Sequence, residues 1–230
     1  MAEDGYAGFP REAARFLKDL TQNNSKAWFD TRRGDYQASM AEPAKDFVIA
    51  MGTRLARIDP GIRAEPKVNG SIFRINRDTR FSKDKSPYKD HLALIFWRGE
   101  GRNRECPGYY FRLSAESLGL AAGLYQMTDA KLARYRSAVL DAAEGSELTK
   151  LLAKLQKGGN QIGGEKFKRV PRGLPADHAN AELLKHKGLY AWVDTAPLPD
   201  LTGDAFADFC FDHFRRMAPL EAWLHRNLEG

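Results

Sequence analysis

The amino-acid sequence predicts a protein of the α+β class, with an antiparallel sheet flanked by helices from the N-terminal and C-terminal parts of the chain. Apolar residues recur at helical spacing in the first and last thirds, whereas the middle third alternates with a period of two. No internal repeat, low-complexity tract or linker interrupts the 230 residues. A single α+β domain over residues 1–230 is therefore the simplest expectation.

The first third is expected to be helical. Pro10 suits the first turn of a helix. The run Asn23-Asn24-Ser25 breaks that helix and can cap the next one. Pro43 opens a further helical segment, and Asp59-Pro60-Gly61 ends it with residues typical of a turn. Between them, apolar residues keep helical spacing at Phe47, Val48, Met51, Leu55 and Ile58.

Five segments are predicted to be strands, and at least four of them are expected to pair in antiparallel fashion. They are residues 67–76, 90–98, 108–114, 118–125 and 188–194. Residues 91–97 are apolar on both faces, which is typical of a central strand. Gly119, Ala121 and Gly123 leave one face of their strand without large side chains. A helix or a ligand that approaches closely would explain this face, and a helix is the simpler explanation.

Helical periodicity returns at residues 130–139 and 148–155. Residues 157–164 form a glycine-rich segment that lacks the Lys-Ser/Thr ending of a phosphate-binding P-loop, and we interpret it as a loop. The closing helix carries an apolar stripe, and Pro219 is expected to start a final turn or a separate short helix. The stripe consists of Phe206, Phe209, Cys210, Phe214 and Met217.

Positive charge is concentrated in two short segments. The formal net charge is +6. Residues 66–91 and residues 166–172 each hold an excess of four cationic side chains, which leaves a net charge of −2 for the rest. Charge confined in this way favours an anionic partner, although acidic residues folded against both segments are the alternative. Two such segments repel unless an anion or acidic side chains lie between them, and we expect them to line one common cleft.

The first basic segment contains a long motif. It reads Arg74-x-x-Arg77-Asp78-x-Arg80-Phe81-x-x-Asp84-Lys85-x-x-Tyr88. Arginine predominates at its start, and a guanidinium group offers a rigid fork of donors that matches phosphate or carboxylate. Pro87 and two nearby serines argue against a helix. The motif is therefore interpreted as an anion-binding loop or a network of ion pairs.

This motif resembles the signature of the bacterial family catalogued as domain of unknown function 2461. The similarity extends over nearly the whole chain. It includes Gly8-Phe-Pro, Trp28-Phe29, residues 69–74, Gly163-Gly-Glu, residues 168–173 and residues 186–190. The family has no established activity, so the resemblance assigns no catalytic role to any residue.

Seven cationic residues are the candidates for binding an anion: Arg74, Arg77, Arg80, Lys85, Lys89, Lys168 and Arg169. Tyr88, His91 and Asp78 are the candidates for proton transfer, because Tyr and His titrate near neutrality when their surroundings are suitable. Each group has a structural alternative. Asp78 and Asp84 would then serve only as salt-bridge partners, and Tyr88 and Phe81 would anchor the loop by packing.

Several classes of site lack the required residues. Cys106 and Cys210 are far apart and form no Cys-x-x-Cys pair. The five histidines show no metal-binding spacing, and neither a metal nor a cofactor is predicted. The acidic N-terminus does not resemble a signal peptide, and the longest apolar run, residues 92–97, is too short to cross a bilayer. A cytoplasmic protein without a membrane partner is expected.

Three functions stay open from the sequence. The first is an arginine-rich pocket for a phosphorylated or otherwise anionic small molecule, with or without catalysis. The second is nucleic-acid binding, which the basic and aromatic residues favour although no recognised motif is present. The third is a structural or interaction module that uses the motif as an internal ion-pair network. We favour the first.

Overall fold

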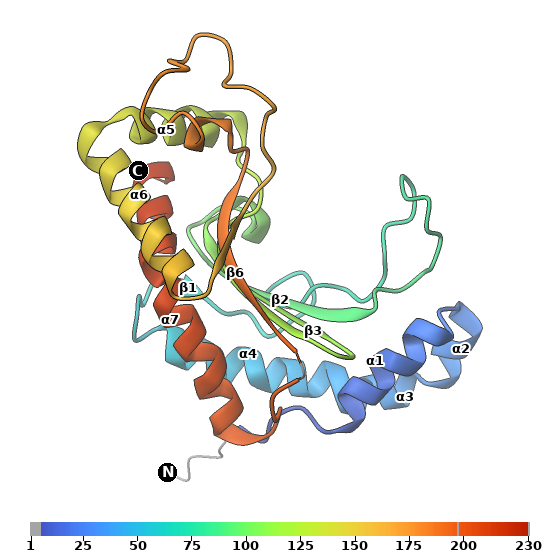
Figure 1. The fold of residues 1–230 in the computed structure, drawn as a ribbon. Coiled ribbons are helices and arrows are strands. Elements are labelled where there is room, and N and C mark those ends of the chain that lie inside the picture. Colours follow the sequence, from blue (N-terminus) through green and yellow to red (C-terminus); the bar gives the residue numbers. More distant parts are fainter. Residues whose placement is uncertain (1–5, 197, 230) are drawn as a thin grey trace. The chain divides into compact units, whose positions relative to one another are not determined.

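The computed structural model describes residues 6–196 and 198–229 (Figure 1). Contacts between residues divide the chain into two compact units. The first unit extends to Phe96 and also contains Tyr110–Leu120 and Asp194–Asp212. The second contains Trp97–Tyr109, Ala121–Val193 and the chain from His213 onward. The single domain expected over residues 1–230 stays a prediction.

The helices of the first unit form where the sequence predicts them. Ser25 caps α2 by accepting a hydrogen bond of 3.3 Å from the Trp28 backbone amide. The expectation that Pro43 opens a separate helical segment is wrong, because α4 continues directly from the preceding π-helical turn and Ala41 and Glu42 are both helical. The elements are α1 (Glu12–Gln22), α2 (Lys26–Thr31), α3 (Arg33–Tyr36), the π-helical turn η1 (Gln37–Ala41) and α4 (Glu42–Leu55).

Six strands form an antiparallel sheet in the order β1-β2-β3-β4-β6-β5. This arrangement confirms the α+β class. Four of the strands correspond to predicted segments, and no described helix is long and apolar enough to span a membrane. The strands are β1 (Ile62–Arg63), β2 (His91–Arg98), β3 (Gly108–Ser114), β4 (Leu118–Leu124), β5 (Gln161–Gly163) and β6 (Leu189–Thr195).

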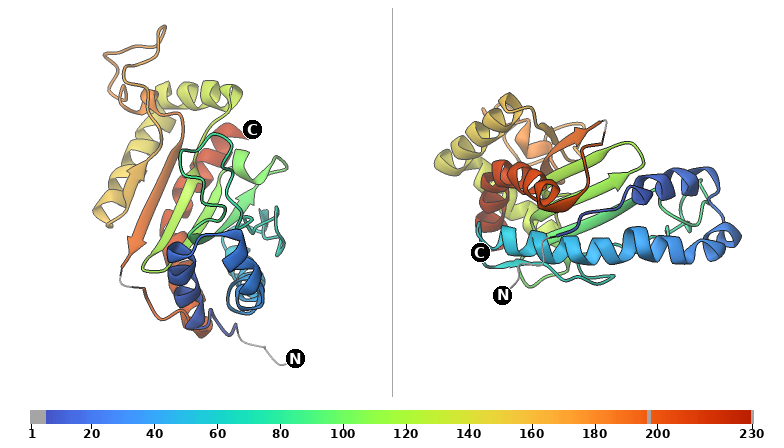
Figure 2. Two further views of the ribbon diagram at one scale, coloured as in Figure 1. Left: turned by 90° about the vertical axis from the view of Figure 1, so that its right-hand side faces the viewer. Right: turned by 90° about the horizontal axis from the view of Figure 1, so that it is seen from below.

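In the first unit, α4 runs along the sheet (Figure 2), and aromatic side chains pack between them. The ring centroid of Phe47 in α4 lies 4.7 Å from that of Phe111 in β3 and 6.5 Å from that of Phe96 in β2. Phe9 and Phe206 complete this core at 5.8 and 5.7 Å from Phe47. All five rings are buried, and each contributes about 2 kcal/mol through removal of its apolar surface from water.

The prediction of a strand over residues 67–76 is wrong. This segment runs beside β2 and forms only isolated bridges. Asn69 has a left-handed φ of 65°, and the Ser71 amide donates to the Glu65 carbonyl over 2.8 Å. The chain therefore folds back on itself at Asn69-Gly70 before it reaches the sheet. Such a turn interrupts the regular pairing that the alternation of side chains predicts.

The expectation that the glycine-rich segment is only a loop is wrong, because the segment contains the strand β5. Gln161 pairs with Trp192, Ile162 with Ala191 and Gly163 with Tyr190, all in antiparallel register. Three residues are too few to show a period of two, and glycine is depleted in strands. The sequence pattern therefore carries no signal for this strand.

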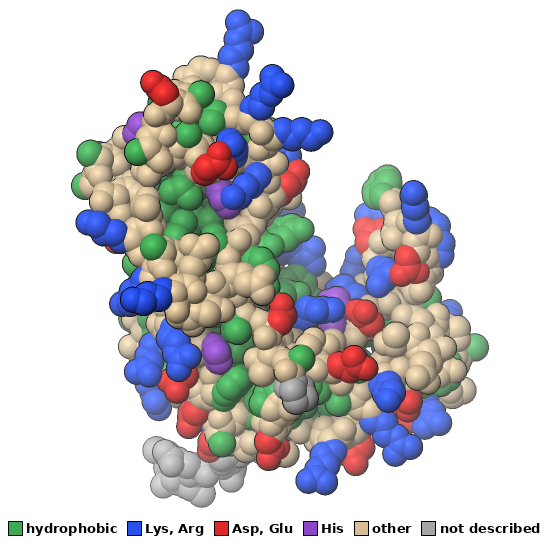
Figure 3. Space-filling model, viewed as in Figure 1, with side chains coloured by type: hydrophobic (Ala, Val, Ile, Leu, Met, Phe, Trp, Pro, Cys, Tyr) green, Lys and Arg blue, Asp and Glu red, His purple; other side chains and the backbone are tan. Residues whose placement is uncertain are grey.

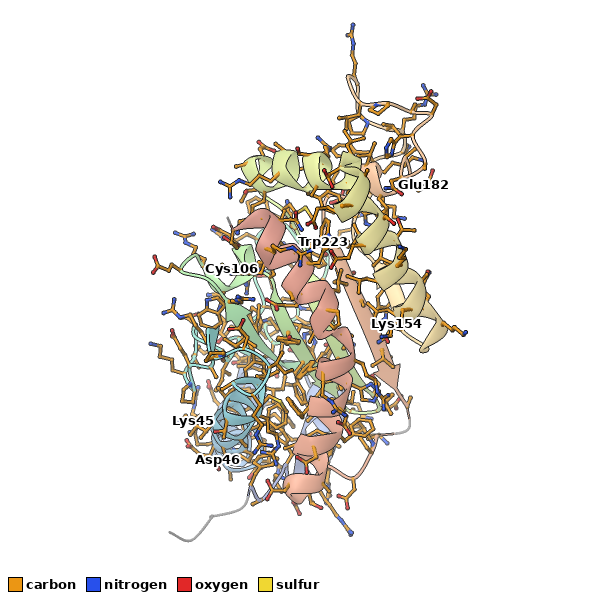
Figure 4. All side chains as sticks on the ribbon, turned by 90° about the vertical axis from the view of Figure 1, so that its left-hand side faces the viewer. Lys45, Asp46, Cys106, Lys154, Glu182 and Trp223 are labelled. Carbon is orange, nitrogen blue, oxygen red and sulfur yellow. The ribbon has the colours of Figure 1, made fainter. Side chains whose placement is uncertain are left out.

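In the second unit, α5 (Asp129–Leu140) and α6 (Ala142–Lys157) contact the C-terminal part of α7 (Gly203–Leu228). The unit also contains the short helices η2 (Asn103–Glu105) and η3 (Leu183–Lys185). Asp141 caps α6 with hydrogen bonds of 2.9 Å from the amides of Ala143 and Glu144. Trp223 projects from α7 toward the start of α6 and donates to the Glu144 carbonyl over 3.2 Å (Figure 4).

The prediction that Pro219 starts a separate helix is wrong, because α7 continues through this residue to Leu228. Proline normally removes a backbone hydrogen bond in the interior of a helix. Leu220, Trp223 and Leu224 on the following turns are completely buried. Their packing offsets the cost of the proline and keeps the helix continuous.

Candidate anion-binding and acid–base site

The predicted motif forms a projecting hairpin-like loop in the first unit (Figure 1). Its two arms are joined by backbone hydrogen bonds from Lys89 to Ile75 over 2.8 Å and from Arg77 to Pro87 over 2.9 Å. Residues 78–86 make up the tip beyond these bonds. The second arm continues directly into β2, so His91 is the first residue of a sheet strand.

Ion pairs organise the tip of this loop. Arg80 donates two hydrogen bonds to the Asp78 carboxylate, of 2.7 Å from Nη2 and 3.0 Å from Nε. Arg77 forms an ion pair with Asp84. The hydrogen bond from Arg80 lowers the pKa of Asp78 to about 2. The Arg80 and Asp78 side chains are 76% and 43% exposed, so this pair lies in water and stabilises the fold only weakly.

The other cations of the loop differ in their surroundings. Lys85 donates to the Thr79 carbonyl over 2.9 Å, and Lys89 donates to the Arg74 carbonyl over 2.6 Å. Basic and acidic side chains interleave over the loop in Figure 3, with a hydrophobic group at its tip. Phe81 is 94% exposed, and the Arg80 guanidinium lies 5.7 Å from its ring centroid. Phe81 therefore does not anchor the loop by packing.

Tyr88 occupies a packed position. Its ring stacks on Phe29 at a centroid distance of 4.1 Å, and only 5% of the residue is exposed. The backbone amide and carbonyl of Tyr88 both bond to the Asn24 side chain, over 3.1 and 3.0 Å. Burial raises the pKa of the Tyr88 phenol, which makes it a weaker acid. These contacts favour the anchoring role of Tyr88 over proton transfer.

His91 and Asp90 form the strongest acid–base arrangement of the loop. His91 Nδ1 lies 2.7 Å from Asp90 Oδ1, and the imidazole is 20% exposed. Burial lowers the pKa of His91, which outweighs the opposing hydrogen bond from Asp90. Burial is the largest single effect on the pKa of Asp90 and tends to raise it, but the bond to His91 and the nearby positive charges together outweigh burial, and the pKa is lowered. A neutral imidazole held by an ionised carboxylate can accept a proton at its other nitrogen.

Arg112 of β3 completes this arrangement. Its positive charge acts on both His91 and Asp90 and lowers the pKa of each. Arg112 alternates along β3 with the buried residues Phe111 and Leu113, so its side chain lies on the sheet face opposite the aromatic core. The Arg112 guanidinium forms no hydrogen bond or ion pair with another residue within 6–196 and 198–229.

Gly119 makes room for acidic and basic side chains on this same face. A Cβ atom at position 119 would lie 2.9 Å from Asp194 Oδ1 and 3.7 Å from Arg112 Cβ. At Gly123 in the second unit, the nearest atoms belong to the backbone of β6. The expectation that a packed helix explains these small residues is therefore wrong for both glycines. Neighbouring strands and their side chains explain them.

The second basic segment lies in the second unit, on the chain between β5 and η3. Lys168 and Arg169 are both exposed there. The backbone bond from Phe167 to the Lys185 carbonyl, of 2.8 Å, ties the start of this segment to the chain before β6. A cleft shared by this segment and the loop of the first unit stays a prediction.

A model of the family DUF2461, described as a conserved hypothetical protein, matches residues 12–223. The chain belongs to this family. No curated protein and no solved structure matches it. The part that matches the DUF2461 model includes the projecting loop, Arg112 and the second basic segment. The description of the family assigns no activity, so any function must be argued from the chemistry of these residues.

Sequence reasoning for this DUF2461 protein found His91 but missed Asp90, Arg112 and Asp194 as members of one group. Asp90 directly precedes β2, Arg112 lies in β3 and Asp194 lies in β6, so no short motif contains all three. One signal was present at Arg112, a charged residue in the middle of an otherwise apolar alternating strand. Among the described residues, no group of three or more His, Cys, Asp or Glu is placed to hold a metal ion.

Proposed function

We propose that the first unit binds an anionic small molecule, of the phosphate or carboxylate class, on the face of the sheet that carries Arg112. Arg112 contacts the anion, and His91, oriented by Asp90, accepts or donates a proton on the bound molecule. The observation that carries this proposal is a largely buried imidazole bonded to a carboxylate, near a guanidinium that forms no hydrogen bond or close ion pair among the described residues.

Arg112, Asp90 and His91 each have a chemical property that suits this role. A guanidinium without a carboxylate partner retains its full set of donors for an incoming oxyanion. The Asp90 carboxylate accepts the Nδ1 proton of His91, which leaves Nε2 with the lone pair that a general base requires. Because burial disfavours the charged form of His91, the imidazole is neutral at pH 7 and ready to take a proton.

Thermal unfolding with a panel of anions tests the proposal. Wild type is expected to be stabilised by inorganic phosphate or by at least one sugar phosphate, nucleotide or carboxylate in the panel, because a ligand that binds only the folded state raises its stability. Arg112→Gln should lose this response. Arg15→Gln removes an exposed arginine from α1 of the same unit and should respond as wild type does. A wild type that responds to none of these anions, or an Arg112→Gln variant that still responds, contradicts the proposal.

The loop arginines are tested with the same assay. If Arg77 and Arg80 help to hold the anion, replacement of either by Ala removes the ligand response while the melting temperature without ligand changes little. Their ion pairs are solvent-exposed, so a small effect on stability is expected. An Arg77→Ala variant that melts far below wild type and keeps its ligand response would assign the motif a structural role.

A further inference from the structure

Three aromatic rings form a row on the sheet of the second unit. The centroid of Tyr190 in β6 lies 5.9 Å from that of Tyr125, with the two planes 25° apart, and 5.6 Å from that of Trp192. Tyr125, directly after β4, is 76% exposed. Tyr190 and Trp192 are half-buried and alternate with the buried residues Leu189 and Ala191. The row therefore lies on the face of β6 opposite the core.

Two rings of the row lie close to a glycine in the adjacent strand β5. Gly163 of β5 lies opposite Tyr190 in the antiparallel register. A Cβ atom on Gly163 would stand 2.6 Å from Cζ3 of Trp192 and 3.0 Å from Cε2 of Tyr190. Any side chain at this position would displace the rings. Glycine at this position leaves the space that atoms of both rings occupy next to β5.

Cationic side chains that form no close ion pair among the described residues begin three residues after this glycine, at Lys166. Lys187 and Lys185 of the same region are paired with Glu165 and Glu182. Four other cations form no ion pair with any residue that the structure describes, and all four are exposed: Lys166, Lys168, Arg169 and Arg172. Two backbone bonds hold the start of this segment beside the approach to β6, from Phe167 to Lys185 and from Lys187 to Glu165.

We propose that this aromatic row and the basic segment 166–172 together bind single-stranded nucleic acid. Exposed aromatic rings stack on unpaired bases, and nearby cations neutralise the phosphates of the backbone. A duplex hides its bases, so the rings would contribute nothing to its binding. A neutral oligosaccharide would use the rings but leave the four cations without a role. The inference goes beyond the proposed small-molecule site and does not depend on it.

Fluorescence anisotropy with a labelled single-stranded oligothymidylate of twelve nucleotides tests the aromatic row. Tyr125→Leu keeps apolar bulk but removes the ring, and it should weaken binding about 10-fold. Tyr125→Phe keeps the ring and should bind within about 2-fold of wild type, since stacking does not use the hydroxyl group. Tyr125 is exposed, so neither change is expected to disturb folding.

The salt dependence of the same binding tests the cations. Lys168→Ala and Arg169→Ala should each lower the slope of log Kd against log salt concentration by about 0.7, the value for one contact with single-stranded phosphate. Lys154→Ala is the matched control. It removes the same charge from the exposed side of α6 in the same unit (Figure 4) and should leave the slope unchanged.

Three results would overturn the inference. They are equal binding by Tyr125→Leu and wild type, equal affinity for a duplex of the same length, and binding of a neutral oligosaccharide in place of the oligonucleotide. Arg112→Gln separates the two proposals, because it removes the proposed small-molecule site of the first unit. This variant should bind the oligothymidylate as wild type does, and a loss of binding would show that the aromatic row is not the site.

Discussion

Oδ1 of Asp194 lies 2.9 Å from the point where a Cβ atom on Gly119 would stand. The carboxylate is the end of a flexible side chain, and Gly119 does not require a left-handed backbone. Gly119→Ala should therefore move the Asp194 carboxylate and change the free energy of unfolding by no more than about 1 kcal/mol, since alanine also restricts the unfolded chain. Chemical denaturation measures this change.

Gly123, four residues later in β4, is the matched control. It has a φ of 138°, and a Cβ atom there would lie 2.3 Å from the Leu189 carbonyl oxygen. Backbone atoms cannot move aside as a carboxylate can, so Gly123→Ala should destabilise the protein by at least about 2 kcal/mol. Equal effects of the two substitutions would show that Asp194 is held as rigidly as the strand itself.

Substitutions at Tyr88 distinguish a packing role of its ring from a proton-transfer role of its hydroxyl group. Because its ring is buried against Phe29, Tyr88→Ala should cost about 3 kcal/mol of stability, as the loss of a packed aromatic ring does. Tyr88→Phe keeps the stack and should cost about 1 kcal/mol or less. Denaturant titrations of both variants give these values. A Tyr88→Phe variant that is stable but loses the function of the site would restore Tyr88 as a proton-transfer group.

The exposed ion pair of the loop makes a prediction about titration. The side-chain hydrogen bond from Arg80, followed by the bond from its backbone amide, holds the pKa of Asp78 at about 2. Arg80→Gln removes the charged donor, and the pKa should rise toward the ordinary value of about 3.9. Carboxyl carbon shifts followed by NMR over pH 1.5–6 would show this change. An Asp78 that already titrates near 4 in wild type would mean that the pair does not persist in solution.

The fold could be predicted from the sequence wherever many residues repeat one pattern. The stripe from Phe47 to Leu55 marks α4, and the alternation around Phe111 marks β3. The strand predicted over residues 67–76 is absent, because Asn69 has a left-handed backbone that ends regular pairing. The alternation of apolar and polar side chains continues through this turn, so the sequence pattern does not reveal it. The short strand β5 offered no pattern at all.

The candidate site could be predicted only in part, because its residues meet through contacts between strands that no local sequence pattern records. His91 was found because it follows the motif, but Arg112 belongs to a different strand and meets the Asp90–His91 pair only through sheet pairing. Cross-strand neighbours depend on register, which a single sequence does not specify before the turns are known. The exposure of Phe81 was equally hidden, since an aromatic residue in a motif is more often buried.

His186 should make the stability of the protein depend on pH. It is buried beside Gly188, whose carbonyl oxygen lies 3.0 Å from Nδ1. Burial, followed by the charge of Lys166, lowers the pKa of His186 to about 4, while the Gly188 carbonyl and Glu182 oppose the shift only partly. Folding therefore disfavours the charged imidazole, and the unfolded chain takes up the proton first as the solution becomes acidic.

The stabilising contribution of neutral His186 is present above its unfolded pKa of about 6.5 and should be lost as the pH falls toward 4. Within this window the free energy of unfolding should fall by up to about 1.4 kcal/mol per pH unit from this residue alone. His186→Asn removes the titrating group, so denaturant titrations at pH 4.5, 5.5, 6.5 and 7.5 should show a smaller decline than wild type. The difference between the two slopes isolates His186 from the carboxylates that also titrate at low pH. Parallel slopes would mean that His186 is as easily protonated in the folded protein as in the unfolded chain.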